Sequence, residues 1–129
     1  MSTTPSTFQL DIPQDLLTGT TVFRDEVTLH TGKDKILALL AHLKDVQKFE
    51  MLTDETCVDY YPKEPRFGIL YQLYSLSRNI RVRVKVMLGE YDASVPSACG
   101  VYVNANWLER EVYDLFGINF ENHPDQRRI

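Results

Sequence analysis

The sequence has 129 residues, of which 43% are hydrophobic and 25% charged, with a formal net charge of −4. These values are typical of one ordinary globular domain and argue against nucleic-acid binding, which needs a basic surface. No window approaches the ~20 consecutive apolar residues of a membrane span, and the polar N-terminus does not resemble a signal peptide, so we expect a cytosolic chain.

The first thirty residues predict a lead-in and one strand. Residues 1–19 begin with a run rich in Ser, Thr and Pro, which favours a loose segment with a short extended or single-turn piece near its end. Residues 20–30 are β-branched and partly alternating, which predicts a strand. Its candidate core residues are Val22, Val27 and Leu29.

An amphipathic helix is predicted over residues 33–43. The Thr-x-x-Asp pattern that starts at Thr31 is a typical N-capping signal. His42 lies away from the centre of the apolar stripe and has no partner at ligand spacing, so we expect it to be solvated. The stripe itself consists of Ile36, Leu37, Leu39, Leu40 and Leu43.

A second extended stretch over residues 52–61 and a hairpin are predicted next, separated by a turn that contains Pro62 and Pro65. The hairpin has arms over residues 66–76 and 79–88, and apolar residues alternate strictly with polar ones in the second arm. The polar side of that arm is a basic stripe of Arg81, Arg83 and Lys85. The stripe is either a solvated sheet face or a surface that faces an acidic neighbour, and the sequence leaves both alternatives open.

Residues 89–103 predict a long irregular approach to a final helix, and loops of this length are usually functional or disordered. Asn104 or Asn106 can cap that helix and Gly117 can end it. At about 100° per residue, the helix has an apolar face and an opposite face that cannot all be buried in one core. The apolar face contains Ala105, Leu108, Val112, Leu115 and Phe116, and the opposite face contains Trp107, Arg110, Glu111 and Asp114.

Self-contained catalysis is not predicted. Cys57 and Cys99 are too few to hold a structural zinc ion or an iron–sulfur cluster, and we expect both to be small buried residues. Glu109 and Glu111 point away from each other on a helix, so they cannot act as a paired acid and base. The sequence also lacks metal-binding, nucleophile-elbow and phosphate-loop motifs. The titratable residues considered for chemistry are Glu109, Glu111, Asp114, His123 and Asp125.

The C-terminal segment resembles the signature of a known family. Val-Pro-Ser at residues 95–97 leads to Ala-Asn-Trp-Leu-Glu-Arg-Glu-Val-Tyr-Asp-Leu-Phe-Gly-Ile at residues 105–118, then to Phe120 and to His-Pro-Asp-Gln-Arg-Arg-Ile at residues 123–129. This pattern is similar to that of the thirty-kilodalton (C) subunit of respiratory complex I, the proton-pumping NADH–quinone oxidoreductase. The resemblance covers roughly residues 20–129 and is far more specific than a short motif.

The resemblance implies an α+β domain with a mixed sheet of about four to five strands and helices mainly on one face. It implies a non-catalytic structural subunit that docks onto the quinone-binding forty-nine-kilodalton (D) subunit and neighbouring iron–sulfur subunits, at the cytoplasmic face of the membrane. Iron–sulfur clusters, FMN and quinone are then expected in partner subunits, and no cofactor or metal is expected here. The predicted partner-binding residues are Trp107, Arg110, Glu111, Asp114, His123, Asp125, Arg127 and Arg128.

Two departures and two alternatives accompany this interpretation. Family members usually continue past Arg-Arg-Ile into a further segment, whereas this sequence ends at Ile129, so the tail is expected to be short. Gln126 stands where an aliphatic residue is common. The first alternative is the equivalent subunit of a membrane-bound energy-converting hydrogenase or formate hydrogenlyase. The second is a small stand-alone enzyme that uses His123 and nearby carboxylates.

Overall fold

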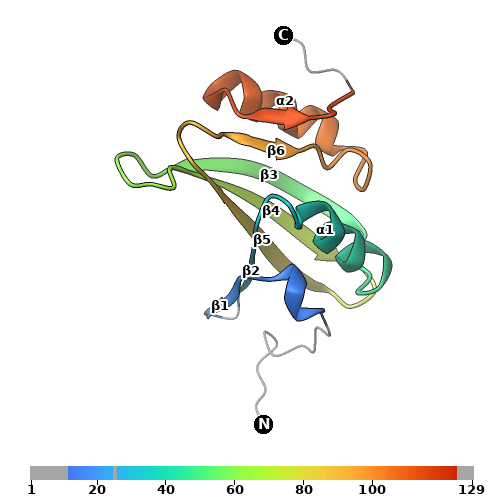
Figure 1. The fold of residues 1–129 in the computed structure, drawn as a ribbon. Helices are drawn as coiled ribbons and strands as arrows, with labels where there is room; N and C mark the ends of the chain where they lie inside the picture. Colours follow the sequence, from blue (N-terminus) through green and yellow to red (C-terminus); the bar gives the residue numbers. More distant parts are fainter. Residues whose placement is uncertain (1–11, 25, 125–129) are drawn as a thin grey trace.

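A five-stranded mixed sheet forms the centre of the fold, with the strand order β1-β2-β5-β4-β3 (Figure 1). The computed structural model describes residues 12–24 and 26–124. The β2–β5 pair is parallel, and the other three pairs of this sheet are antiparallel. The strands are β1 (Gly19–Phe23), β2 (Glu26–Thr31), β3 (Met51–Asp59), β4 (Phe67–Ser75) and β5 (Ile80–Leu88). The predicted α+β class and strand number are confirmed.

The predicted strand over residues 20–30 is wrong in one respect, because it consists of two strands. β1 and β2 form an antiparallel hairpin in which Phe23 pairs with Glu26, and Arg24 in the turn has a φ of 51°. β1 lies at the edge of the sheet, and Val22 there is 56% exposed instead of buried. Val27 and Leu29 of β2 are buried as predicted. Three consecutive charged residues, Arg24, Asp25 and Glu26, interrupt the alternation in the sequence, and the prediction did not treat them as the boundary between two strands.

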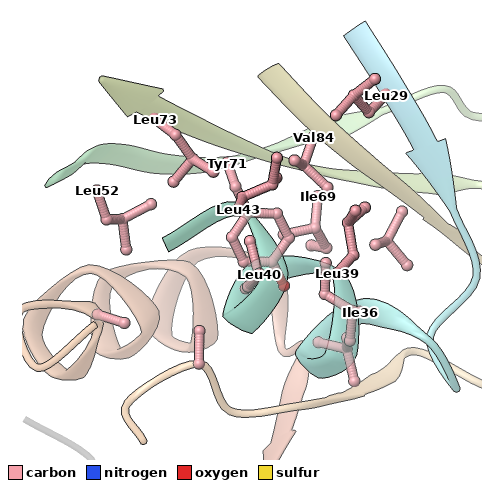
Figure 2. Packing of buried hydrophobic residues seen from close by; sticks show 14 of the residues in the cluster. Leu29, Ile36, Leu39, Leu40, Leu43, Leu52, Ile69, Tyr71, Leu73 and Val84 are labelled. Carbon is pink, nitrogen blue, oxygen red and sulfur yellow. The ribbon is translucent and has the colours of Figure 1, made fainter. Parts of the chain in front are cut away.

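Helix α1 (Ile36–Asp45) covers one face of the sheet. Figure 2 shows its Leu39, Leu40 and Leu43 packed towards the strands, and all three are fully buried. Leu37 is the member of the predicted stripe that faces outward, with 38% exposure. The predicted N-cap is wrong, since the Thr31 hydroxyl donates to the Leu16 carbonyl in the preceding 3-10 helix, η2 (Gln14–Leu16), at 2.6 Å.

The β4–β5 hairpin and the extended stretch before it are confirmed. β4 and β5 pair from Phe67–Leu88 to Ser75–Ile80, and β3 pairs with the other edge of β4. In β5 the apolar positions Val82, Val84 and Val86 are buried against α1, whereas the basic stripe lies on the opposite face of the sheet. The alternation of apolar and basic residues in the sequence therefore predicted the buried and exposed faces of β5 correctly.

A small second sheet supports the final helix, α2 (Ala105–Phe116). The expected irregular approach over residues 89–103 contains a short strand, β6 (Ser94–Pro96), which pairs in parallel with β7 (Asn119–Glu121). Figure 1 shows that α2 and these strands lie beside β3. The predicted helix end is confirmed, because Gly117 adopts a left-handed conformation with a φ of 73° that glycine accommodates without strain.

The side chains before α2 connect it to the central sheet. Asn104 occupies the N-cap position, but its side chain makes no capping bond and donates instead to the Leu52 carbonyl at 2.7 Å. The buried Tyr102 hydroxyl donates to the Phe49 carbonyl at 2.6 Å. Both acceptors lie more than fifty positions earlier in the chain, just before and in β3. The two bonds therefore fix the start of the helix against the central sheet.

The cysteines are less buried than predicted. Cys57 and Cys99 are free thiols of intermediate burial, because Cys57 lies near the end of the edge strand β3 and Cys99 lies in a turn. Burial raises the pKa of Cys57 to about 12, with a contribution from Asp59. Within residues 12–24 and 26–124, no helix combines the length and hydropathy of a membrane span.

Leu40→Ala should lower the free energy of unfolding by about 2–5 kcal/mol, because it leaves a cavity between α1 and the sheet. Leu37→Ala is the matched control on the same helix, and its cost should be no more than about 1 kcal/mol since that side chain already contacts solvent. Urea denaturation followed by circular dichroism measures both changes. Equal costs would contradict the packing described for α1.

Candidate functional site

The outer face of α2 presents an aromatic ring among charges. Trp107 is 56% exposed, Glu111 and Asp114 are exposed, and Arg110 is half-buried. The Arg110 guanidinium lies 5.4 Å from the centroid of the Trp107 ring, as expected for residues three apart on a helix. The structure therefore brings together four of the predicted partner-binding residues, and the expected exposure of the tryptophan is confirmed.

Leu115 also lies on this outer face, which corrects its assignment to the buried stripe. It is 77% exposed, and Val103 just before the helix is 83% exposed. Counting about 100° per residue places Leu115 about 80° from Trp107 and nearer to it than to the centre of the buried face. We call Val103, Trp107, Arg110, Glu111, Asp114 and Leu115 the outer face of α2.

His123, another predicted partner-binding residue, is not brought onto this face. The His123 side chain is 1% exposed, and its Nε2 lies 3.0 Å from the Asn106 carbonyl and 3.9 Å from Glu109 Oε1. Its position beneath the helix differs from the surface position expected for a partner-binding residue. Asp125, Arg127 and Arg128 lie outside the described residues.

Glu109 is fully buried beneath the outer face, whereas the sequence analysis directed it away from Glu111 but assigned it to neither face of the helix. Its Oε1 accepts a hydrogen bond from the Ser97 hydroxyl at 2.6 Å, and its Oε2 accepts one from the Ala98 amide at 2.8 Å. The spacing contained this signal, because Glu109 follows Ala105 by four residues and precedes Val112 by three. Those intervals place all three on one side of a helix.

A second buried acid lies on the neighbouring strand. Glu55 of β3 is 2% exposed, and its carboxyl group lies beside that of Glu109, with which it shares a hydrogen bond when one of the two is protonated. The buried Tyr71 hydroxyl on β4 has no hydrogen-bond partner among the described residues. No sequence motif marks Glu55, since the alternation of β3 contains polar residues on both faces.

The electrostatics of this cluster favour protonation. Burial raises the pKa of Glu55 well above its usual range, and the neighbouring charge of Glu109 raises it further. Burial also raises the pKa of Glu109, although the Ala98 amide, the Ser97 hydroxyl and His123 oppose that shift. Burial and both carboxylates raise the pKa of Tyr71. Two carboxylates in one buried site cannot both ionise cheaply, so we expect the Glu55 side to retain its proton.

Among the described residues, Cys99, Glu109 and His123 form the group that could together approach a metal ion. Their candidate ligand atoms lie within 4.8 Å of one another. However, both oxygens of Glu109 already accept hydrogen bonds, and His123 Nε2 is within hydrogen-bonding distance of a carbonyl, which requires a proton on that nitrogen. The group is therefore arranged as a hydrogen-bond network that fixes α2. His123 Nε2 carries a proton, whereas a metal ligand at that atom would need a free lone pair.

Comparisons with known proteins agree on one family. The family model described as "Respiratory-chain NADH dehydrogenase, 30 Kd subunit" matches residues 29–129. The C subunit of the NADH-quinone oxidoreductase of Geotalea uraniireducens is 49% identical over 107 residues, which cover 83% of this chain and 65% of that protein. The protein of the same name from Rhizobium rhizogenes is 38% identical over 126 residues, covering 96% of this chain and 62% of that protein. The chain thus spans a little under two thirds of the length of these curated relatives.

Two solved structures share the fold. A trypsin-resistant fragment of Nqo5 matches with a TM-score of 0.73 and 36% identity, covering 78% of this chain and 82% of that one. A chain of the membrane-bound sulfane sulfur reductase, an archaeal respiratory membrane complex, matches with a TM-score of 0.71 and 28% identity. That match covers 81% of this chain and 62% of the other.

Glu109→Gln should lower the free energy of unfolding at neutral pH by about 1–3 kcal/mol, because one amide NH₂ would replace an oxygen that accepts a buried hydrogen bond. Glu111→Gln makes the same chemical change two residues away on the exposed side of the helix and should cost less than about 0.5 kcal/mol. Urea denaturation of the two variants measures the difference. Equal costs would mean that the Ser97 and Ala98 bonds do not stabilise the helix.

Glu55→Gln should make stability less dependent on pH. A carboxyl whose pKa is raised in the folded protein binds its proton more tightly there than in the unfolded chain. The contribution of Glu55 to the free energy of unfolding is therefore greatest below its ordinary pKa of 4.5, and it is lost as pH rises towards the raised pKa of the folded state. The free energy of unfolding changes by at most about 1.4 kcal/mol per pH unit for each such group. Because glutamine cannot ionise, the stability of the variant relative to the parent should increase steadily between pH 5 and 9. Thermal denaturation across that range measures the trend, and parallel curves would contradict it.

Proposed function

The chain belongs to the family of the 30 kDa subunit of respiratory-chain NADH dehydrogenase, and from this premise we propose its role in the assembled enzyme. It serves as a non-catalytic structural subunit of the hydrophilic, quinone-module arm of a proton-translocating NADH–quinone oxidoreductase. Electrons pass from NADH to quinone through iron–sulfur clusters and FMN in other subunits. The chain itself sits at the cytoplasmic face of the membrane as a peripheral component.

The observation that carries this proposal is the exposed tryptophan on the outer face of α2. Leaving a large aromatic side chain in water forgoes the stabilisation that its burial would give. Tryptophan and arginine are also the residue types that most often dominate protein–protein binding energy. Together with Leu115 and Val103, Trp107 gives the outer face an apolar centre bordered by charges, which is the usual arrangement of an interface.

We infer that the D subunit is the partner of this face, in keeping with the family resemblance of the α2 sequence. Glu111 and Asp114 are exposed and can pair with cations of a neighbouring subunit, where exclusion of water strengthens such pairs. Asp125, Arg127 and Arg128 follow closely in the sequence, and we propose that they extend the same contact. His123 supports the face from beneath by its position between Asn106 and Glu109.

The buried acid cluster supports the docking role by fixing the helix before a partner arrives. Glu109 joins the middle of α2 to the Ser97–Ala98 turn, and Asn104 joins its start to β3. A preorganised surface loses less conformational entropy on binding. The same residues therefore stabilise the isolated domain and keep the outer face in one geometry.

A second candidate is the corresponding subunit of another membrane-bound respiratory complex. The specific observation in its favour is the likeness to a chain of the sulfane sulfur reductase complex, whose TM-score is close to that of the Nqo5 fragment. The equivalent subunit of an energy-converting hydrogenase or formate hydrogenlyase is a further form of this second candidate. Native purification distinguishes them, because a companion NADH-binding flavoprotein supports the first function and a nickel-site large subunit supports a hydrogenase.

Trp107→Ala and Glu111→Lys should each reduce co-purification of the D subunit from native membranes by tenfold or more, since the loss of an interface anchor typically costs about 2 kcal/mol or more. Affinity purification of the tagged chain, followed by quantitative mass spectrometry, measures the loss. Tyr91→Ala, at a 93% exposed aromatic residue outside α2, is the matched control and should leave assembly unchanged. Thermal denaturation of the purified variants should show a retained fold. Normal assembly of both outer-face variants would overturn the docking proposal.

A further inference from the structure

A groove crosses the face of the central sheet that α1 does not cover. It lies where β2 and β5 diverge, because their parallel pairing begins at Thr28 and Arg83 and the residues before these positions separate. Its volume is about 320 Å³, and a second hollow of about 330 Å³ shares Arg83 with it. We call this the arginine groove, and its lining includes Arg24, Glu26, Gln72, Tyr74, Arg81 and Arg83.

Positive charge is concentrated in this groove, although the whole chain is acidic with a net charge of −4. Arg24, Arg81 and Arg83 line it, and Glu26 is the one carboxylate among the lining residues that the structure describes. Glu26 Oε1 lies 3.5 Å from Arg83 Nη2 and is itself on a 64% exposed side chain, so it neutralises the groove only weakly. Lys85 continues the basic row into the neighbouring hollow.

The arginines are held in place by the sheet. The Arg81 guanidinium lies 5.5 Å from the centroid of the Tyr74 ring, and the Tyr74 hydroxyl donates to Asn79 Oδ1 at 2.6 Å. A guanidinium that is held in place before binding loses less side-chain freedom on binding, which favours recognition of a carboxylate.

The spacing of these donors matches an extended peptide. Arg81 and Arg83 are two residues apart on one strand, so they project from the same face about 6.7 Å apart along it. Alternate side chains of an extended segment have the same separation. We propose that the arginine groove binds an extended segment of a partner protein that carries acidic residues at alternate positions, a contact separate from the outer face of α2.

A peptide fits these observations better than a lipid surface or a nucleic acid. Arg83 is only about one third exposed on its side chain, so its charge is recessed within the sheet face. A membrane or a duplex would also approach the acidic remainder of the chain, whose net negative charge repels it. A narrow segment meets mainly the local field of the groove, where three arginines outnumber the one carboxylate among the described lining residues.

Fluorescence anisotropy of the purified chain with a fluorescein-labelled octapeptide of alternating glutamate and threonine tests the proposal. At low salt, where exposed charges are weakly screened, the peptide should bind, and a glutamine-for-glutamate peptide should bind at least tenfold more weakly. The R81E/R83E double variant should also weaken binding by tenfold or more. R81Q/R83Q, which removes the charge without reversing it, should weaken binding to a smaller extent.

Lys35→Glu is the matched control, because Lys35 is an exposed cation at the start of α1 on the other side of the sheet. It should leave peptide affinity unchanged, as should Trp107→Ala on α2. Equal losses in the Lys35 and arginine variants would overturn the proposal by showing a response to net charge alone. Tighter binding of phosphatidylserine vesicles or single-stranded DNA at the same arginines would also overturn it, as would equal affinity for the glutamine peptide.

Discussion

The position of the final helix depends on one buried carboxylate. Glu109 accepts hydrogen bonds from the Ser97 hydroxyl and the Ala98 amide, so the centre of α2 is tied to the turn that follows β6. A buried acid is tolerated only when such donors compensate for its lost hydration. Because Glu109 occupies the inward side of the helix, Trp107 and the charged residues of α2 are directed outward. Together with the Tyr102 and Asn104 bonds, this interaction fixes both how the helix packs and what it presents to a partner.

Much of the fold could be predicted because its elements follow simple periods. The alternation of β5 and the apolar spacing of α1 reflect burial on one side only, and Gly117 marks a backbone conformation that other residues adopt with strain. The β1–β2 turn and β6 were missed for a physical reason. The charged run Arg24-Asp25-Glu26 is as compatible with an exposed edge strand as with a turn, and a three-residue strand is defined by a partner far along the chain.

The site was predicted in part. Trp107 and its charged neighbours could be placed on one face because helical geometry relates them directly. The buried cluster beneath them could not, since Glu55, Tyr71 and Glu109 come from three elements that only tertiary structure brings together. Glu109 did carry a local signal in its spacing from Ala105 and Val112. A charged residue within an apolar stripe is thus better interpreted as a buried hydrogen-bonding group than as part of the solvated face.

The parallel pairing of β2 with β5 has a consequence for the order in which the chain acquires its structure. Residues 28–31 add to the sheet only beside residues 83–86, so more than fifty residues must be closed into a loop before that ladder forms. The β4–β5 hairpin, whose contacts are local, can form first and act as the template. During synthesis, the β1–β2 hairpin and the apolar side of α1 therefore remain uncovered until β5 has left the ribosome. That interval is when this chain most needs protection from aggregation.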